Sequence, residues 1–394
     1  MKFRWWLLIG IPLLLLVVFL ATSGGDPRRS LTGMISGAAA LDYLPPRREV
    51  AQVAGPPQPR LSLAEAGVDP ESVDVAMRYA ETRNTSALII GVNGHLVYEK
   101  YWSGTTLASA VDLSEFTPVL AALVLGTAQQ NGEIRDLDAP VSTWLTEWAQ
   151  DPRGTITLRD LLTGNSNLAA PGNRTWPRSL AASYYVEENL NATLMAWPQA
   201  GKVDSLGSPP AVDADVLSLV LQRAFKSNYG KLLGERIWQP LGGGSYSIGI
   251  DGKYSSMGHD RAGCCLRASI GDWLRVGTLI ANRGVFEGNQ LLSPDFTRLL
   301  VTPTHNGSPR AVFLKVDGQF AARDVVRLEA AGKQRMWMVP SLKLVIMRLG
   351  DEPSKSQGWD EAMIPDNIIR GTRGWDQSHT VDGDKIDPKR YAPH

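Results

Sequence analysis

Residues 110–168 read AVDLSEFTPVLAALVLGTAQQNGEIRDLDAPVSTWLTEWAQDPRGTITLRDLLTGNSNL and predict a helix, a long turn and the start of a second helix. Pro118 suits the first turn of the first helix, where its missing N–H leaves no bond unmade. Asn131 and Gly132 favour the helix end because glycine readily adopts the left-handed backbone conformation. The apolar residues of this helix recur at helical spacing and predict a broad buried face: Val119, Leu120, Leu123, Val124 and Ala128.

Two runs after this helix, residues 137–148 and 156–168, resemble the segment that follows the active-site serine in β-lactamase-related serine hydrolases. Gly126 and Gly132 match the same framework. This family includes class C β-lactamases, D-alanyl-D-alanine peptidases, esterases and 6-aminohexanoate-dimer hydrolases. In these enzymes a Ser-x-x-Lys motif opens the helix, and the lysine, one turn after the serine, supplies the base that a serine nucleophile needs.

The sequence lacks this motif at the expected place. Aligning on the two framework glycines places Glu115 at the serine and Pro118 at the lysine. Moving the alignment by one residue uses Ser114, the weak candidate nucleophile, but then Thr117 stands at the lysine. No lysine in the chain has a serine three residues before it. A structural interpretation also fits, because Ser114 and Glu115 suit a helix cap and first turn, where exposed amides and the helix dipole favour oxygen and negative charge.

The family's other two motifs are also altered. A Tyr-x-Asn motif, whose tyrosine relays protons, is expected just before a helix at 215–224, but residues 207–211 read Gly-Ser-Pro-Pro-Ala. A Lys-Thr-Gly or His-x-Gly motif is expected on an inner strand, and Ala-Gly-Lys-Gln at 331–334 occupies the nearest position. Lys333 and Gln334 are therefore cleft candidates, together with Glu115. Lys333 would suit an anion there, while a solvated lysine is the simpler interpretation. His305-Asn-Gly fits the motif formally but lies in a polar loop before that strand.

The resemblance covers residues 61–370 and implies a β-lactamase and penicillin-binding-protein-like α/β fold. Its antiparallel sheet would combine an N-terminal hairpin with the C-terminal strands, with helices on its faces and a helical lobe inserted between Leu120 and about Ile280. Local patterns agree. Asp69-Pro70 predicts a helix to about Arg83, and Asn93-Gly94 between two apolar runs predicts the hairpin 87–102. A last hairpin is predicted at 336–349.

The chain outside this domain predicts export. Residues 1–24 contain an apolar run, 5–21, behind Lys2 and Arg4. The run is long enough for one transmembrane helix, although the small residues after it also fit a cleaved signal peptide. We favour an uncleaved anchor, which predicts a single-pass inner-membrane protein with its globular domain in the periplasm. Residues 25–60, rich in Pro and Arg, predict a linker, and residues 371–394 a polar C-terminal tail.

Composition and residue spacing exclude several other classes. The 40 basic and 40 acidic residues give a net charge of zero, so no nucleic-acid partner is expected. No spacing of His and Cys indicates zinc, and we expect no metal and no cofactor. Cys264 and Cys265 are expected to be two core thiols, because adjacent cysteines rarely bridge each other. The five histidines show no recognisable Ser-His-Asp order, but a triad assembled in space stays open.

Three hypotheses follow. The first is a membrane-tethered, β-lactamase-like domain that has lost catalysis and now binds, either as a subunit of a membrane assembly with membrane-protein partners or as a receptor for cell-wall or small amide ligands. The second is an active amide or ester hydrolase with a rebuilt site, in which Ser114 is the candidate nucleophile. The third is a purely structural periplasmic domain. The second hypothesis requires a base within hydrogen-bond reach of a serine hydroxyl, and the sequence supplies none by motif.

Overall fold

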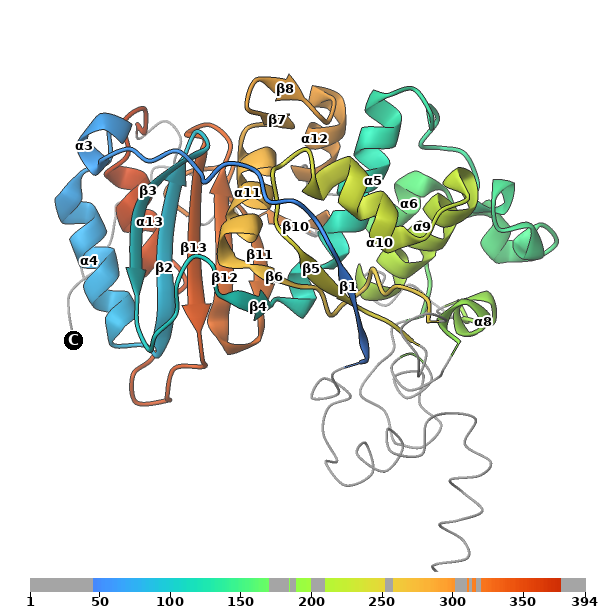
Figure 1. Ribbon diagram of the computed structural model, residues 1–394, viewed down its shortest axis with the longest axis horizontal. Coiled ribbons are helices and arrows are strands. Elements are labelled where there is room, and N and C mark those ends of the chain that lie inside the picture. Colours follow the sequence, from blue (N-terminus) through green and yellow to red (C-terminus); the bar gives the residue numbers. More distant parts are fainter. Residues whose placement is uncertain are drawn as a thin grey trace, which may run out of the picture.

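The computed structural model describes residues 45–169, 184, 189–199, 210–251, 258–301, 310–311, 314–316 and 320–376. Two antiparallel sheets and a group of helices make up most of this part of the chain (Figure 1). The predicted α/β architecture with antiparallel sheets and flanking helices is therefore confirmed. No helix of the described residues is both long and apolar enough to cross a membrane, and the run 1–21 lies outside these residues.

The larger sheet has seven strands in the order β3-β2-β13-β12-β11-β10-β9. It joins the first hairpin to the C-terminal strands because β2 pairs with β13, with Ile90 opposite Ile346. Both predicted hairpins are confirmed. The strands are β2 (Thr85–Val92), β3 (His95–Tyr101), β9 (Arg310–Ala311), β10 (Leu314–Val316), β11 (Val326–Ala330), β12 (Gln334–Val339) and β13 (Leu344–Gly350).

Helices cover both faces of this sheet. On one face lie α4 (Pro70–Glu81) and α13 (Met363–Arg370), which pack against each other beside β2 and β3 (Figure 1). As predicted, Asp69 caps α4 and accepts bonds from the amides of Glu71 and Ser72. On the other face lies α11 (Ile270–Ala281), whose Gly277 permits close contact with Met336 and Val345. Alternate residues of each central strand thus enter two different cores.

The lobe beside the sheet is built around α5 (Pro118–Gln130). This helix begins and ends as the sequence predicts, with Pro118 in its first turn and Gly132 in the left-handed conformation just after it. Helix α9 (Pro210–Phe225) packs along it (Figure 1). The other helices of the lobe are α6 (Leu158–Thr163), α8 (Leu190–Met195), α10 (Tyr229–Leu233) and a π-helical turn at Gly234–Trp238.

A smaller sheet of four strands, in the order β1-β5-β6-β4, lies between the lobe and the large sheet (Figure 1). Its strands are β1 (Arg47–Val50), β4 (Ala110–Asp112), β5 (Tyr246–Gly249) and β6 (Arg267–Ser269). Strand β1 comes from the segment expected to be a linker. It pairs with β5 over its whole length, and the Gly55 amide donates to the Gly242 carbonyl. Residues 45–60 therefore pack on the domain, which differs from the expectation that the packed body begins near Leu61.

The short elements complete the description. Residues 371–376, expected to begin a polar tail, also contact the body, since the Trp375 indole donates to the Ala321 carbonyl at 2.9 Å. The remaining regular elements are α3 (Leu63–Ala66), α12 (Pro294–Val301), β7 (Val285–Phe286), β8 (Asn289–Gln290) and the 3-10 turns η2 (Ser114–Phe116), η3 (Val141–Thr143), η4 (Thr146–Trp148), η5 (Pro152–Thr155) and η7 (Ala331–Lys333).

Arg348 ties one end of the large sheet together. Its fully buried side chain donates to four oxygens: Thr85 Oγ1 at 3.0 Å and the carbonyls of Arg83, Gly332 and Asp351. Burial, with the nearby Arg335, lowers the pKa of Arg348 to about 10. These bonds join β13 to the loops before β2 and before β12.

We predict that Arg348→Met lowers the free energy of unfolding by about 2–4 kcal/mol, because buried carbonyls lose their donors. Urea unfolding followed by circular dichroism measures this change. Arg78→Met, at an exposed position of α4, is the matched control, with an expected change within about 0.5 kcal/mol. Equal stability of the two variants would contradict the role given to Arg348.

Candidate active site

Ser114 lies at a corner where β4 turns through η2 into α5. Strand β4 is fixed by pairing with β6, with Asp112 opposite Arg267. Leu113 and Phe116 are buried, and the Phe116 ring meets the edge of Trp273 at a centroid distance of 5.8 Å. The apolar residues on both sides of Ser114 thus enter the core and hold the serine at the corner, half-buried.

The Ser114 hydroxyl is hydrogen-bonded to a carboxylate. It donates to Asp112 Oδ1 at 2.7 Å, while Asp112 Oδ2 forms an ion pair with the guanidinium of Arg47. Arg47 also donates to the Cys265 carbonyl at 3.4 Å. The side chains of Asp112 and Arg47 are only 25% and 19% exposed. We call these three residues, Arg47, Asp112 and Ser114, the serine corner. In the serine corner, the Ser114 hydroxyl donates a hydrogen bond to the Asp112 carboxylate, and this carboxylate also forms an ion pair with Arg47.

The two positions at which the family carries its lysine hold no amine. Thr117 is buried; its hydroxyl donates to the Leu113 carbonyl at 3.4 Å and accepts from the Leu266 amide at 3.3 Å. Pro118 is buried as the first residue of α5. Glu115 is exposed. The hydroxyl of Thr117 is therefore part of the packing between η2 and the segment before β6, and it offers Ser114 no base.

Lys333 and Gln334 lie at the turn between β11 and β12. Lys333 has a positive φ of 57° and its ammonium lies 3.7 Å from a Glu352 carboxylate oxygen. The preceding Gly332 carbonyl accepts from Arg348 at 2.6 Å. Both candidate side chains are half-buried. The ammonium of Lys333 thus already has a carboxylate neighbour, which weakens the case for it as an anion ligand.

Strand β11 lies beside η2, the turn that contains Ser114. Three of its residues, Val326, Leu328 and Ala330, are buried in the same core as Leu113 and Phe116. Strand β11 therefore contributes apolar side chains to the core that surrounds Leu113 and Phe116. His305 and residues 207–209 of the altered Tyr-x-Asn position lie outside the described residues.

A buried acidic pair follows that altered position, at the start of α9. Asp215 accepts bonds from the Tyr184 hydroxyl and from the amides of Ala262 and Gly263, the latter two at 2.6 and 2.8 Å. Asp213 accepts from the Ser166 hydroxyl at 2.6 Å. Burial raises the pKa of both carboxyl groups. Sequence reasoning missed this network; the signal was two aspartates in the mostly apolar first half of α9.

The two cysteines form a disulfide with each other, which corrects the expectation of two core thiols. Both residues are 6% exposed, and Cys265 has a left-handed φ of 72°. Because Cys265 adopts this uncommon backbone conformation, the adjacent cysteines can bridge within the loop before β6. The same loop contacts the serine corner through the Cys265 carbonyl.

A second pair that sequence reasoning missed joins Asp251 and His259. The imidazole Nδ1 lies 2.8 Å from Asp251 Oδ2, and Asp251 also accepts from the amides of Leu190 and His259. The hydrogen bond to Asp251 raises the pKa of His259 against the effect of burial. Burial opposes ionisation of Asp251, but the bonds from His259 and Leu190 outweigh it and lower the pKa of Asp251. No group of three potential metal ligands occurs in the described ranges.

The Asp251–His259 pair predicts a pH-dependent contribution to stability. Because the pKa of His259 is raised in the folded state, its contribution is complete below the ordinary value near 6.5 and is lost as the pH rises through the folded value. His259→Gln is therefore expected to destabilise the protein more at pH 5.5 than at pH 8.5, measured by urea unfolding. His95→Gln, which removes an imidazole without a carboxylate partner, is the control. A loss independent of pH would contradict this role for the ion pair.

Comparisons with known proteins agree with this geometry. A family model described as Beta-lactamase matches residues 76–346, more than half of the chain. No curated protein matches the sequence significantly. Among solved structures, one named as a 6-aminohexanoate-dimer hydrolase, from Bacillus anthracis, is 16% identical with a TM-score of 0.62, over 83% of this chain and 89% of its own.

Two further structures have similar folds. A penicillin-binding protein homologue from Caulobacter crescentus is 13% identical with a TM-score of 0.58, over 77% of this chain and 96% of its own. A family VIII carboxylesterase is 13% identical with a TM-score of 0.57, over 77% and 99%. At these identities the likeness shows the fold alone. The match over residues 76–346 shows more: the chain belongs to the β-lactamase family of serine hydrolase-related proteins.

Proposed function

We propose that this protein is a membrane-tethered, periplasmic β-lactamase-like domain that binds a ligand or a membrane-protein partner without acyl transfer. The observation that carries the proposal is the serine corner. Ser114 donates a hydrogen bond to Asp112, which forms an ion pair with Arg47, and Thr117 and Pro118 stand where the family places its lysine.

The chemistry of serine supports this interpretation. A serine hydroxyl is a weak nucleophile at neutral pH and needs a neighbouring base whose pKa lies near the working pH. Both oxygens of the Asp112 carboxylate are already engaged, because Oδ1 accepts the hydrogen bond from Ser114 and Oδ2 forms the ion pair with Arg47. The corner thus favours a hydrogen-bonded, resting serine over an attacking one.

Two features support the proposed location. The apolar run 5–21 follows Lys2 and Arg4, the pattern of an inner-membrane anchor whose C-terminal side is exported. The Cys264–Cys265 disulfide suits an oxidising compartment such as the periplasm. We propose that such a domain serves as a subunit that docks a partner or a cell-wall or amide ligand.

One observation favours a second candidate function, an amide or ester hydrolase with a rebuilt site. The carboxylate of Asp112 is 2.7 Å from the Ser114 hydroxyl oxygen, which is within reach for proton transfer. If Arg47 moved on substrate binding, Asp112 would act as the base. If the protein is such a hydrolase, a reagent that reacts with active serines should modify Ser114, and this reaction should require the Asp112 carboxylate.

Labelling with a fluorophosphonate, read by intact mass, separates the two functions. We predict no mass shift for the full chain, because Ser114 lacks a competent base. A fluorescent penicillin is expected to give the same negative result. An active serine hydrolase treated in parallel confirms that the probes react.

Three variants complete this experiment. Labelling of the natural chain that is lost in Ser114→Ala and in Asp112→Asn, but kept in Ser354→Ala, would establish the rebuilt hydrolase and contradict our proposal. Ser354 is the matched control because it is an exposed serine near the end of the large sheet. Labelling that persists in Ser114→Ala would identify a different nucleophile and would contradict both assignments.

Cell fractionation tests the proposed location. We predict that the full chain sediments with inner membranes and that protease added to spheroplasts degrades its domain, because the domain lies outside the cytoplasm. Deleting residues 2–24 should leave the protein soluble inside the cell. Thiol alkylation provides a second readout, since Cys264 and Cys265 should resist it until they are reduced. A protease-protected domain in spheroplasts would contradict export.

A further inference from the structure

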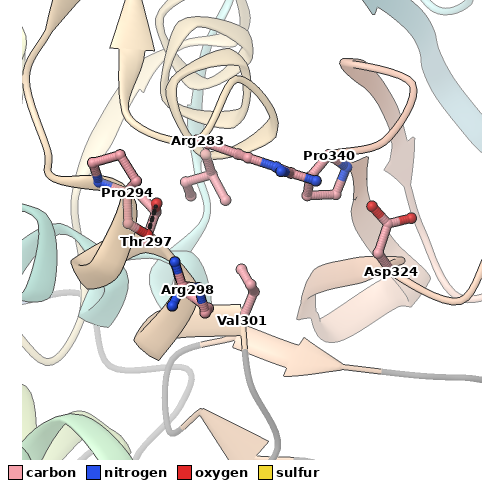
Figure 2. A pocket seen from close by; sticks show the side chains of 8 residues that line it. Arg283, Pro294, Thr297, Arg298, Val301, Asp324 and Pro340 are labelled. Atoms are coloured by element: carbon pink, nitrogen blue, oxygen red, sulfur yellow. Dashed lines mark hydrogen bonds between the residues drawn. The ribbon is translucent and has the colours of Figure 1, made fainter.

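A cavity of about 310 Å³ lies at the end of the fold where α11 and α12 meet the turn between β12 and β13. Figure 2 shows Arg283 extending towards Pro340 on one side, with Asp324 near Pro340 and Arg298 and Val301 on the side of α12. Its apolar wall includes Ile280, Val301 and Pro340. The volume is at the lower end of the range for small-molecule sites, about 300–1,000 Å³.

This cavity is separate from the serine corner. Helix α11 begins beside β4, where the Ile270 amide donates to the Ser109 carbonyl at 3.1 Å. The helix has 12 residues and ends at Ala281, next to the cavity. Since a helix rises about 1.5 Å per residue, the cavity and the corner are separated by about 18 Å along α11.

Three charged residues line the cavity: Arg283, Arg298 and Asp324. Arg298 pairs with Asp295 on its own helix at 3.0 Å. Asp324 accepts from the amide and the hydroxyl of Ser341, at 2.6 and 2.9 Å. The guanidinium of Arg283 has neither an ion pair nor a hydrogen bond with any described residue. Arg283 and Asp324 are thus charges of opposite sign that have no ion-pair partner among the described residues.

A tight turn places the exposed residue Arg283 at the edge of the cavity. The residue follows the end of α11 with a φ of 54°, and Gly284 after it has a φ of 85°. Gly284 is required there, because a Cβ would lie 2.4 Å from the Leu292 carbonyl oxygen. From this turn the Arg283 side chain extends towards Pro340 (Figure 2).

We propose that this cavity binds a small organic monocarboxylate with an apolar body. The carboxylate pairs with the planar fork of the Arg283 guanidinium, which matches its two oxygens. The apolar body lies against Ile280, Val301 and Pro340. Asp324 disfavours a second negative group on the ligand, since like charges in one site repel. The proposal does not depend on any activity at Ser114.

Fluorine NMR of the full chain with 4-fluorobenzoate as the probe tests the site. We expect concentration-dependent line broadening of 4-fluorobenzoate, and binding of 4-fluorobenzamide that is about tenfold weaker because the amide lacks the charge. Arg283→Gln should weaken 4-fluorobenzoate binding by a similar factor of about ten and leave the amide unchanged.

Two further variants make the test specific. Arg78→Gln removes an exposed guanidinium from α4, on the far face of the sheet, and should leave binding of the probe unchanged. Asp324→Asn should improve binding of 4-fluorophthalate, which carries two carboxylates. Binding that survives Arg283→Gln, equal binding of the amide, or no binding of 4-fluorobenzoate would each overturn the proposal.

Discussion

The burial of α5 is the constraint on which the rest of the structure depends. Every residue from Pro118 to Ala128 is buried, so the helix has no solvent face over that length. Its neighbours include α9, α10 and the turn η2. Gly126 allows close approach of α12, because a Cβ there would lie 2.5 Å from the Phe296 ring. Such an enclosed helix is held by packing, whatever chemistry its N-terminus performs.

The packing around α5 is complete, while the residues near Ser114 differ from the family's Ser-x-x-Lys motif. Thr117 and Pro118 stand at the two positions where that motif would have its lysine. Thr117 illustrates the change, since its hydroxyl joins Leu113 to the Leu266 amide in the core. Arg47 is a second example, because strand β1 places its guanidinium in contact with Asp112 and with the Cys265 carbonyl. The serine corner thus braces the small sheet against α5, and membership of a hydrolase family does not by itself imply turnover.

The sequence predicted the parts of the fold that local patterns determine. Asp69 at the start of α4, Asn93-Gly94 in the first hairpin and Gly132 after α5 each act within a few residues, so their outcome could be stated in advance. The serine corner needs contacts between residues 65 positions apart, Arg47 and Asp112, which no local pattern encodes. Strand β1 was missed because its Pro-rich and Arg-rich surroundings are typical of a linker. The Cys264–Cys265 disulfide was missed because it needs the uncommon backbone of Cys265, and the Asp251–His259 pair because it depends on tertiary packing.

The central claim is that Ser114 rests in its hydrogen bond to Asp112 and does not form an acyl intermediate. Stopped-flow release of p-nitrophenol from p-nitrophenyl acetate, with protein in excess, measures this step most directly. The account predicts release at the same rate with the natural chain and with Ser114→Ala, and no burst. A burst equal in amount to the protein, and absent in Ser114→Ala, would contradict it.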